Sequence, residues 1–155
     1  MEILTIFDKR EVNVMYETYT RQALPSKEYR ELLGSALCVF NSNNAFIIEN
    51  VLRSDDHNQY DWYRLIDLES GKLKEPIKNT ITEKSDENIA NLFNELVTMR
   101  NRIVHSFQVT CCDEQKLATK VKGSGEQFVI TEDYLMKFIK KNEQLSTALH
   151  CFRGY

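Results

Sequence analysis

The stretch SDENIANLFNELVTMRNRIVHSFQ, residues 85–108, decides the fold of this 155-residue chain. Its apolar residues recur every three or four positions, which places them on one face of an α-helix. Ser85 and Asp86 are residue types that cap helix N-termini. The pattern therefore predicts an amphipathic helix from about Ser85 to Gln108. That helix needs other helices against its apolar stripe, which consists of Ile89, Leu92, Phe93, Leu96, Met99, Ile103 and Phe107.

The same reasoning predicts three more helices, at about Lys9–Ala23, Lys27–Leu52 and Thr131–Phe152. Between the helix over residues 85–108 and the helix at Thr131–Phe152, alternating residues on either side of a Gly-Ser-Gly turn predict a β-hairpin at about residues 115–130. Residues 60–82 have no clear period, and we expect short helical or irregular pieces there that cover one end of the bundle. The prediction is a mainly α single domain over residues 1–155. It is an up-and-down four-helix bundle with a small hairpin before the C-terminal helix.

Composition limits the classes of function. The chain has 20 basic and 23 acidic residues, a net charge of −3, so it is not expected to coat nucleic acid through charge alone. Its four cysteines lack the spacing of a zinc site or a disulfide framework. No apolar run is long enough for a membrane span or a signal-peptide core. We therefore expect a cytoplasmic protein without a metal or other cofactor.

Arg100 breaks the apolar pattern of the helix predicted over residues 85–108, which we call the motif helix. On a helical wheel with Leu96 at zero, Arg100 falls at about 40°, inside the apolar stripe. A guanidinium stays charged, and burying it without a partner costs several kcal/mol. Arg100 therefore needs a carboxylate, several carbonyl groups, or an anionic ligand in a pocket or interface. Glu49 and Glu95 are the structural candidates for that carboxylate.

The polar residues that follow Arg100 lie on another face of the same helix. Asn101 and His105 are four residues apart and share a face, and Arg102 lies three residues before His105. His105 is about 140° from Arg100 around an ideal helix. One straight helix does not present Arg100 and His105 as a close pair. A second helix, or a second copy of this helix across a homodimer interface, would resolve that geometry.

Arg100, Asn101 and His105 resemble the signature of the HEPN superfamily (higher eukaryotes and prokaryotes nucleotide-binding domain). That signature is an Arg, a polar residue and, after a short gap, a His. Here four residues separate the Arg from the His. The superfamily fold is a helical bundle of about this length with the motif on a late helix, in keeping with the pattern above.

The resemblance implies a metal-independent endoribonuclease with a composite active site in a homodimer. His105 takes the proton of a ribose 2′-hydroxyl, Arg100 holds the scissile phosphate, and Asn101 orients the phosphate or the imidazole. The products carry 2′,3′-cyclic phosphate and 5′-hydroxyl ends. Many members act in stress or antiphage defence, some as toxins with an antitoxin or regulatory partner. The alternative is a non-catalytic dimer of the same fold that binds nucleotide, RNA or a partner protein.

Other cations are candidates for binding the RNA substrate. Arg102 is a supporting cation beside the motif, and the hairpin lysines Lys120 and Lys122 follow the motif helix directly. Lys72, Lys74 and Lys78 form a separate basic group that is ordinarily solvated surface. A run of amides in the second helix includes Asn44 on its apolar seam. Asn44 is interpreted either as a buried amide that fixes the register of the bundle or as a residue lining the site.

Overall fold

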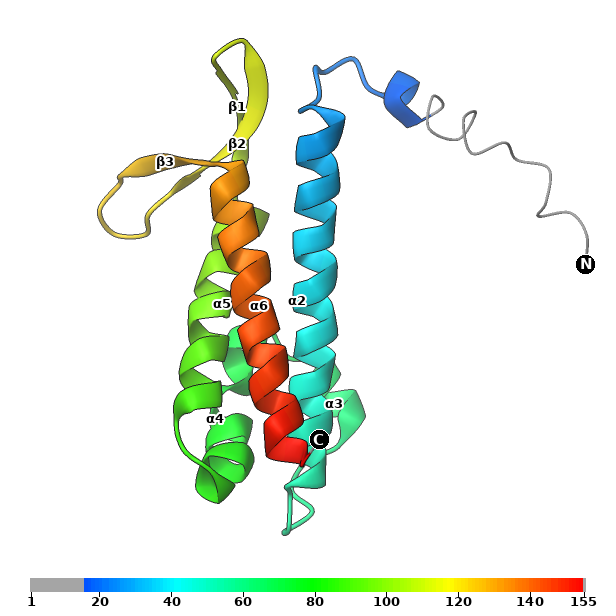
Figure 1. Cartoon of the computed structure of the whole chain (residues 1–155), viewed down its shortest axis with the longest axis vertical. Coiled ribbons are helices and arrows are strands. Elements are labelled where there is room, and N and C mark those ends of the chain that lie inside the picture. Colours follow the sequence, from blue (N-terminus) through cyan, green and yellow to red (C-terminus); the bar gives the residue numbers. More distant parts are fainter. Residues whose placement is uncertain (1–15, 155) are drawn as a thin grey trace, which may run out of the picture.

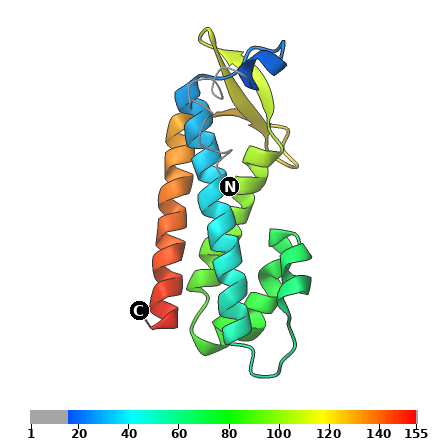
Figure 2. The same ribbon diagram turned by 90° about the vertical axis from the view of Figure 1, so that its right-hand side faces the viewer.

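Three long helices run side by side in the computed structural model, which describes residues 16–154 (Figures 1 and 2). They are α2 (Lys27–Arg53), α5 (Asn88–Val104) and α6 (Glu132–Arg153). In Figure 1, α2 and α6 descend while α5 ascends between the two ends of the bundle. The predicted up-and-down arrangement therefore holds for three long helices, and the fold is mainly helical.

The N-termini of α2 and α6 each carry a side-chain cap. The Ser26 hydroxyl accepts a hydrogen bond from the Tyr29 amide at 3.2 Å, and the Thr131 hydroxyl accepts one from the Tyr134 amide at 3.1 Å. Each hydroxyl satisfies an amide that has no partner within its own helix. Gly154 ends α6 with a φ of 93°, a conformation that glycine adopts without steric cost.

The helix predicted over Lys9–Ala23 is wrong where the structure tests it. Tyr16–Tyr19 form one 3-10 turn (η1), and residues 20–26 are not helical; residues 9–15 lie outside the described part. Tyr16 and Tyr19 are exposed, so their spacing does not mark a face packed on the bundle. Arg30 of α2 holds the turn instead, by donating to the Tyr16 hydroxyl and the Glu17 carboxylate, each at 2.8 Å.

Residues 60–82 form short helical pieces that cover the lower end of the bundle in Figure 1, as expected. α3 (Trp62–Asp67) comes first. A continuous run follows: a 3-10 turn at Ser70–Leu73 (η2), then α4 (Lys74–Ile77), then a wider π turn at Lys78–Thr82 (η3). Pro76 lies within this run and has no amide hydrogen to donate. A regular α-helix is therefore interrupted here, and the pitch changes.

One phenylalanine from each long helix meets at the centre of the core. The Phe40 ring lies 6.1 Å from that of Phe93 and 6.0 Å from that of Phe138, centroid to centroid, and both pairs are stacked. All three rings are at most 1% exposed. Such pairs add about 0.5–1.5 kcal/mol each beyond the area they bury. They join α2, α5 and α6 along one level of the bundle.

A buried amide pair joins α2 to α6, one residue away from the predicted position. Asn43 donates to the backbone and side-chain oxygens of Asn142 at 2.8 and 3.0 Å. Both residues are at most 6% exposed. Asn44 itself is only half-buried and accepts a hydrogen bond from the Ser70 hydroxyl at 2.8 Å. It therefore does not belong to the buried amide pair, and it does not line the cavity described below.

The sheet has three strands, one more than the predicted hairpin. β1 (Phe107–Cys111), β2 (Glu114–Lys120) and β3 (Gln127–Ile130) are antiparallel in the order β1-β2-β3. The predicted hairpin corresponds to β2 and β3. β1 uses residues that were assigned to the end of the motif helix, because Phe107 fits the helical stripe and no Gly or Pro separates it from His105. α5 therefore ends at Val104 rather than near Gln108.

Tyr29 connects the first turn of α2 to the sheet. Its hydroxyl donates to the carbonyl of Ile130 at 2.6 Å and accepts from the amide of Leu117 at 3.2 Å. Leu117 and Ile130 are paired residues of β2 and β3. The ring is 1% exposed, and burial raises the pKa of the hydroxyl. A single side chain thus holds two strands against a helix that lies about a hundred residues away in the sequence.

Candidate functional site

A cavity of about 660 Å³ lies where the C-terminal end of α5 meets the sheet, near the top of Figure 1. It gathers the predicted site residues Asn101, Arg102, His105, Lys120 and Lys122. Thr98, Phe107, Thr119 and Val121 complete the lining. The predicted residues thus share one concave surface, with the exception of Arg100.

Helical spacing explains the contribution of α5 to this cavity. Thr98, Asn101, Arg102 and His105 follow one another at intervals of three, one and three residues and so lie on one face, opposite the buried Leu96. His105 is the residue that ends α5, and its amide donates to the Asn101 carbonyl at 2.9 Å. The helix thus stops where its polar face reaches the sheet.

The end of β2 supplies the opposite wall. β1 pairs with β2 so that Phe107 lies opposite Ala118, which places Thr119 and Lys120 just beyond the start of β1. Phe107 is 42% exposed although it is a large aromatic residue. Sequence reasoning missed the roles of Phe107 and Thr119, because they depend on a strand pairing that the helical pattern concealed.

Most polar side chains in the cavity have no partner in the described part of the chain. Asn101, His105, Lys120 and Lys122 make no side-chain hydrogen bond or ion pair with any residue from 16 to 154. None of the lining residues is an aspartate or a glutamate. Three cations and a histidine therefore face one space without a neutralising carboxylate, an arrangement suited to an anionic ligand.

Arg102 is the lining cation that the protein itself holds in place. Its guanidinium carbon lies 5.6 Å from the centre of the Phe128 ring, and that ring packs against Tyr134 at 5.8 Å. Burial raises the pKa of the Tyr134 hydroxyl, and the charge of Arg102 opposes that rise. A cation–π contact contributes about 0.5–2 kcal/mol and fixes the direction of the side chain.

Arg100 lies apart from this cavity, against the core. Its guanidinium carbon is 5.2 Å from the centre of the Phe40 ring. Its Nε is buried and has no hydrogen-bond partner. The carboxylates that sequence reasoning offered as partners are engaged elsewhere, Glu95 with Lys141 and Glu49 with Arg153. The position on the apolar face is as the helical wheel indicates, but neither proposed carboxylate neutralises the charge.

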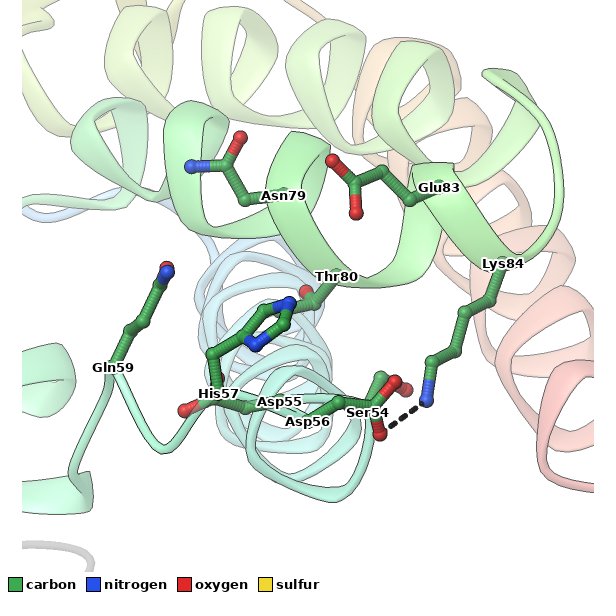
Figure 3. A pocket seen from close by; sticks show the side chains of 9 residues that line it. All are labelled: Ser54, Asp55, Asp56, His57, Gln59, Asn79, Thr80, Glu83 and Lys84. Atoms are coloured by element: carbon green, nitrogen blue, oxygen red, sulfur yellow. Dashed lines mark hydrogen bonds and ion pairs between the residues drawn. The ribbon is translucent and has the colours of Figure 1, made fainter.

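A second cavity, of about 360 Å³, lies at the opposite end of the bundle (Figure 3). Three of its charged side chains, those of Asp55, Asp56 and Lys84, already have structural partners. The Asp55 carboxylate accepts from the Tyr60 amide at 2.8 Å, and Asp56 pairs with Lys84 at 2.9 Å, the dashed line in Figure 3. His57 is an exposed loop residue here, and sequence reasoning assigned it no function. We therefore treat this cavity as structural.

The remaining findings concern metals, membranes and relatives. Between residues 16 and 154, no group of three or more His, Cys, Asp or Glu is arranged to bind a metal ion. In the same range, no helix combines the length and the apolar character that crossing a membrane requires. Comparisons with protein-family models, curated proteins and solved structures each found no match for this chain.

Proposed function

We propose that the chain is a metal-independent endoribonuclease of the HEPN type that acts as a homodimer. The observation that carries this proposal is the cavity at the end of α5, where His105 faces Arg102, Lys120 and Lys122 with no carboxylate in the lining. Asn101 of the same motif lines it as well. A base and a set of phosphate-binding cations are the two parts that RNA transesterification needs.

The cations also offset an unfavourable feature of the location. The C-terminal end of a helix carries about half a negative charge, which disfavours an anion. Three positive charges, those of Arg102, Lys120 and Lys122, lie at the end of α5 and outweigh the partial negative charge of the helix end. A phosphate is therefore attracted to the cavity although the chain as a whole has a net charge of −3.

The proposed reaction needs only proton transfer and charge stabilisation. His105 removes the proton from the ribose 2′-hydroxyl, and the 2′-oxygen attacks the adjacent phosphorus. The bond from phosphorus to the 5′-oxygen breaks, and that oxygen takes a proton from water to leave as a 5′-hydroxyl. The protonated His105 then returns its proton to the solvent, so no net proton is gained or lost. The other product is a 2′,3′-cyclic phosphate. General base catalysis contributes about 10²- to 10⁴-fold, and Arg102 stabilises the charge on the phosphate oxygens.

Arg100 is the reason that the proposal includes a second protomer. Its guanidinium packs on Phe40, whereas His105 faces the cavity, so one chain does not bring both to one phosphate. In the composite site that the HEPN resemblance implies, the motif helices of two protomers meet and each supplies part of the machinery.

Phe107 adds a surface for a nucleobase. An aromatic ring that is 42% exposed beside three cations is suited to stacking an unpaired base while the cations hold the backbone. Such stacking contributes about 1–3 kcal/mol per base. The proposed substrate is accordingly RNA with at least one unstacked nucleotide at the cleavage position.

The test is cleavage of mixed RNA by the purified full-length chain in the presence of EDTA. Wild type should produce 2′,3′-cyclic phosphate ends, and H105A, R102A and R100A should each lose most of that activity. H57A is the matched control, because His57 is also an exposed histidine but lies at the far end of the bundle. Absence of wild-type cleavage, or cleavage that H105A leaves unchanged, would overturn the proposal.

The competing function is binding without cleavage, by a HEPN-like dimer that takes nucleotide, RNA or a partner protein. The net charge of −3 favours it. RNA binding that depends on Lys120 and Lys122, without any strand scission by wild type, would support this alternative over the enzyme.

A further inference from the structure

The tip of the β1–β2 hairpin brings two thiols together, far from the cavity at the end of α5. Cys111 is the last residue of β1, and Cys112 and Asp113 form the two-residue turn. The two sulfur atoms are 3.9 Å apart. Cys112 is exposed and Cys111 is half-buried, so both are accessible from solution. The proposed RNA chemistry uses neither of them.

The backbone of the turn is what places the sulfurs side by side. In a regular strand, consecutive side chains point to opposite faces of the sheet. Here Cys112 has a φ of 56° and Asp113 a φ of 63°, the left-handed pair of a type I′ turn. This conformation brings the Cys112 side chain to the same side as that of Cys111. A cysteine is uncommon at such a position, where Asn and Gly predominate.

The same geometry argues against a disulfide between the two residues. Consecutive Cα atoms across a trans peptide are about 3.8 Å apart, and no cis peptide is present among the described residues. Disulfide-bonded cysteines have Cα atoms about 4.4–6.8 Å apart. The pair is therefore suited to remain two thiols and to act as a two-sulfur chelate.

We propose that Cys111 and Cys112 form a binding site for soft, thiophilic centres that are satisfied by two sulfur ligands. The simplest case is an aryl derivative of trivalent arsenic, in which the third arsenic bond is to carbon. Thiolate ligands select such soft ions. No third His, Cys, Asp or Glu joins the pair within residues 16–154, so a closed tetrahedral zinc site is not formed. The chelate needs no third protein ligand.

With an arylarsenic oxide as the ligand, the binding step is an exchange without electron transfer. Two arsenic–sulfur bonds form, and the two thiol protons leave on the arsenic-bound oxygen as one water molecule. Because the second sulfur binds within the same molecule, the chelate should hold the arsenical about 10²- to 10⁴-fold more tightly than one thiol does.

The experiment uses phenylarsine oxide and the reduced full-length protein, with intact-mass spectrometry as the readout. Wild type should take up one equivalent that a dithiol removes and that a monothiol at equal thiol concentration does not. C111S and C112S should each lose this uptake. C38S/C151S is the matched control, since it removes two exposed thiols elsewhere and should retain the adduct.

Circular dichroism of each variant establishes that its fold is intact, which is expected because both serine substitutions lie at a hairpin tip. Undiminished uptake by C111S or C112S would overturn the proposal. So would loss of uptake in C38S/C151S, or removal of the adduct by the monothiol. RNA cleavage is not part of this readout, so the result stands independently of the proposed ribonuclease activity.

Discussion

Arg100 lies against the core without an ion pair or a side-chain hydrogen bond to any residue from 16 to 154. Its Nε is buried and unpartnered, and its one specific contact is with the Phe40 ring. An unsatisfied buried donor costs about 1–3 kcal/mol, while a cation–π contact returns about 0.5–2 kcal/mol. These terms nearly cancel, so Arg100 is not explained by a contribution to stability.

Replacement of Arg100 by methionine therefore separates stability from function. R100M keeps an unbranched apolar side chain against Phe40 and removes the buried Nε. We expect a free energy of unfolding within about 1 kcal/mol of wild type, measured by urea denaturation, together with loss of RNA cleavage. A loss of more than about 2 kcal/mol would instead show that Arg100 stabilises the bundle.

The positions of some of these residues could be predicted from the sequence, and the positions of others could not. The helical period correctly placed Arg100 toward the core and Asn101, Arg102 and His105 on another face, because that geometry is local. It did not identify Phe107 as part of the cavity, since that role depends on where a strand pairs. For the same reason, no local pattern distinguishes Asn43, which meets Asn142, from its neighbour Asn44.

The pair formed by Asn43 and Asn142 determines how α2 and α6 meet. Asn43 donates two hydrogen bonds to Asn142, and Asn142 donates to the Phe138 carbonyl of its own helix at 2.9 Å. Buried polar groups that satisfy one another contribute modestly to stability, whereas one left alone is costly. The pair therefore acts mainly as a constraint on helix register.

A double-mutant cycle tests that account. N142L alone should lower the free energy of unfolding by about 1–3 kcal/mol, because it leaves the Asn43 amide buried without a partner. N43L/N142L should recover most of that loss, since both polar groups are then gone. Urea denaturation of the four proteins gives the coupling energy. Additive losses would show that the two amides act independently.

The first turn of α6 is joined to β2 by an ion pair that depends on pH. Lys116 lies 3.1 Å from Glu132. Hydrogen bonding to its own backbone amide, and then to Lys116, lowers the pKa of the Glu132 carboxyl. A depressed pKa in the folded protein means that this stabilisation is present above the ordinary pKa of a glutamate. It is lost as the pH falls through the folded value.

E132Q should accordingly be less stable than wild type at pH 7 by about 0.5–1 kcal/mol. The difference should disappear in acid, once Glu132 is protonated in the folded wild-type protein. Thermal melts at a series of pH values measure it. E143Q, a substitution at an exposed position in the middle of α6, is the control and should show no such pH dependence. A difference that persists at low pH would contradict the assignment.

At the scale of the molecule, the elements were more predictable than their connections. α2, α5 and α6 follow from long apolar periods, and the hairpin of β2 and β3 follows from its glycine-rich turn. Side-chain caps mark the starts of α2 and α6, whereas α5 begins at Asn88, three residues after the predicted Ser85, and its N-cap residue Glu87 makes no side-chain cap hydrogen bond. The helix predicted at Lys9–Ala23, where the structure describes it, and the end of α5 were mispredicted, because exposed tyrosines and Phe107 carry the same spacing as core residues. Periodicity records which residues are apolar, and tertiary contacts decide which of them are buried.

The distribution of charge predicts how RNA binding responds to salt. The net charge is −3, so attraction must come from Arg102, Lys120 and Lys122 locally. For single-stranded RNA, the logarithm of the binding constant should fall with the logarithm of salt concentration with a slope of about −2. Fluorescence anisotropy of a labelled oligonucleotide measures this slope.

K120A/K122A should reduce the magnitude of that slope by about 1.4, or about 0.7 for each phosphate contact that is lost. K72A/K74A removes the same number of charges at the other end of the bundle and should leave the slope unchanged. Equal effects of the two double variants would show that binding is diffuse rather than located at the end of α5.

The Tyr29 hydroxyl has a consequence for cooperativity. Because it accepts from the Leu117 amide and donates to the Ile130 carbonyl, it couples two sheet residues to the start of α2. The sheet therefore should not open on its own while the bundle remains closed. Amide hydrogen exchange at Leu117 should occur only when α2 detaches, and it should match the slow exchange of the helical core. In Y29F, that amide should exchange early while the core stays protected.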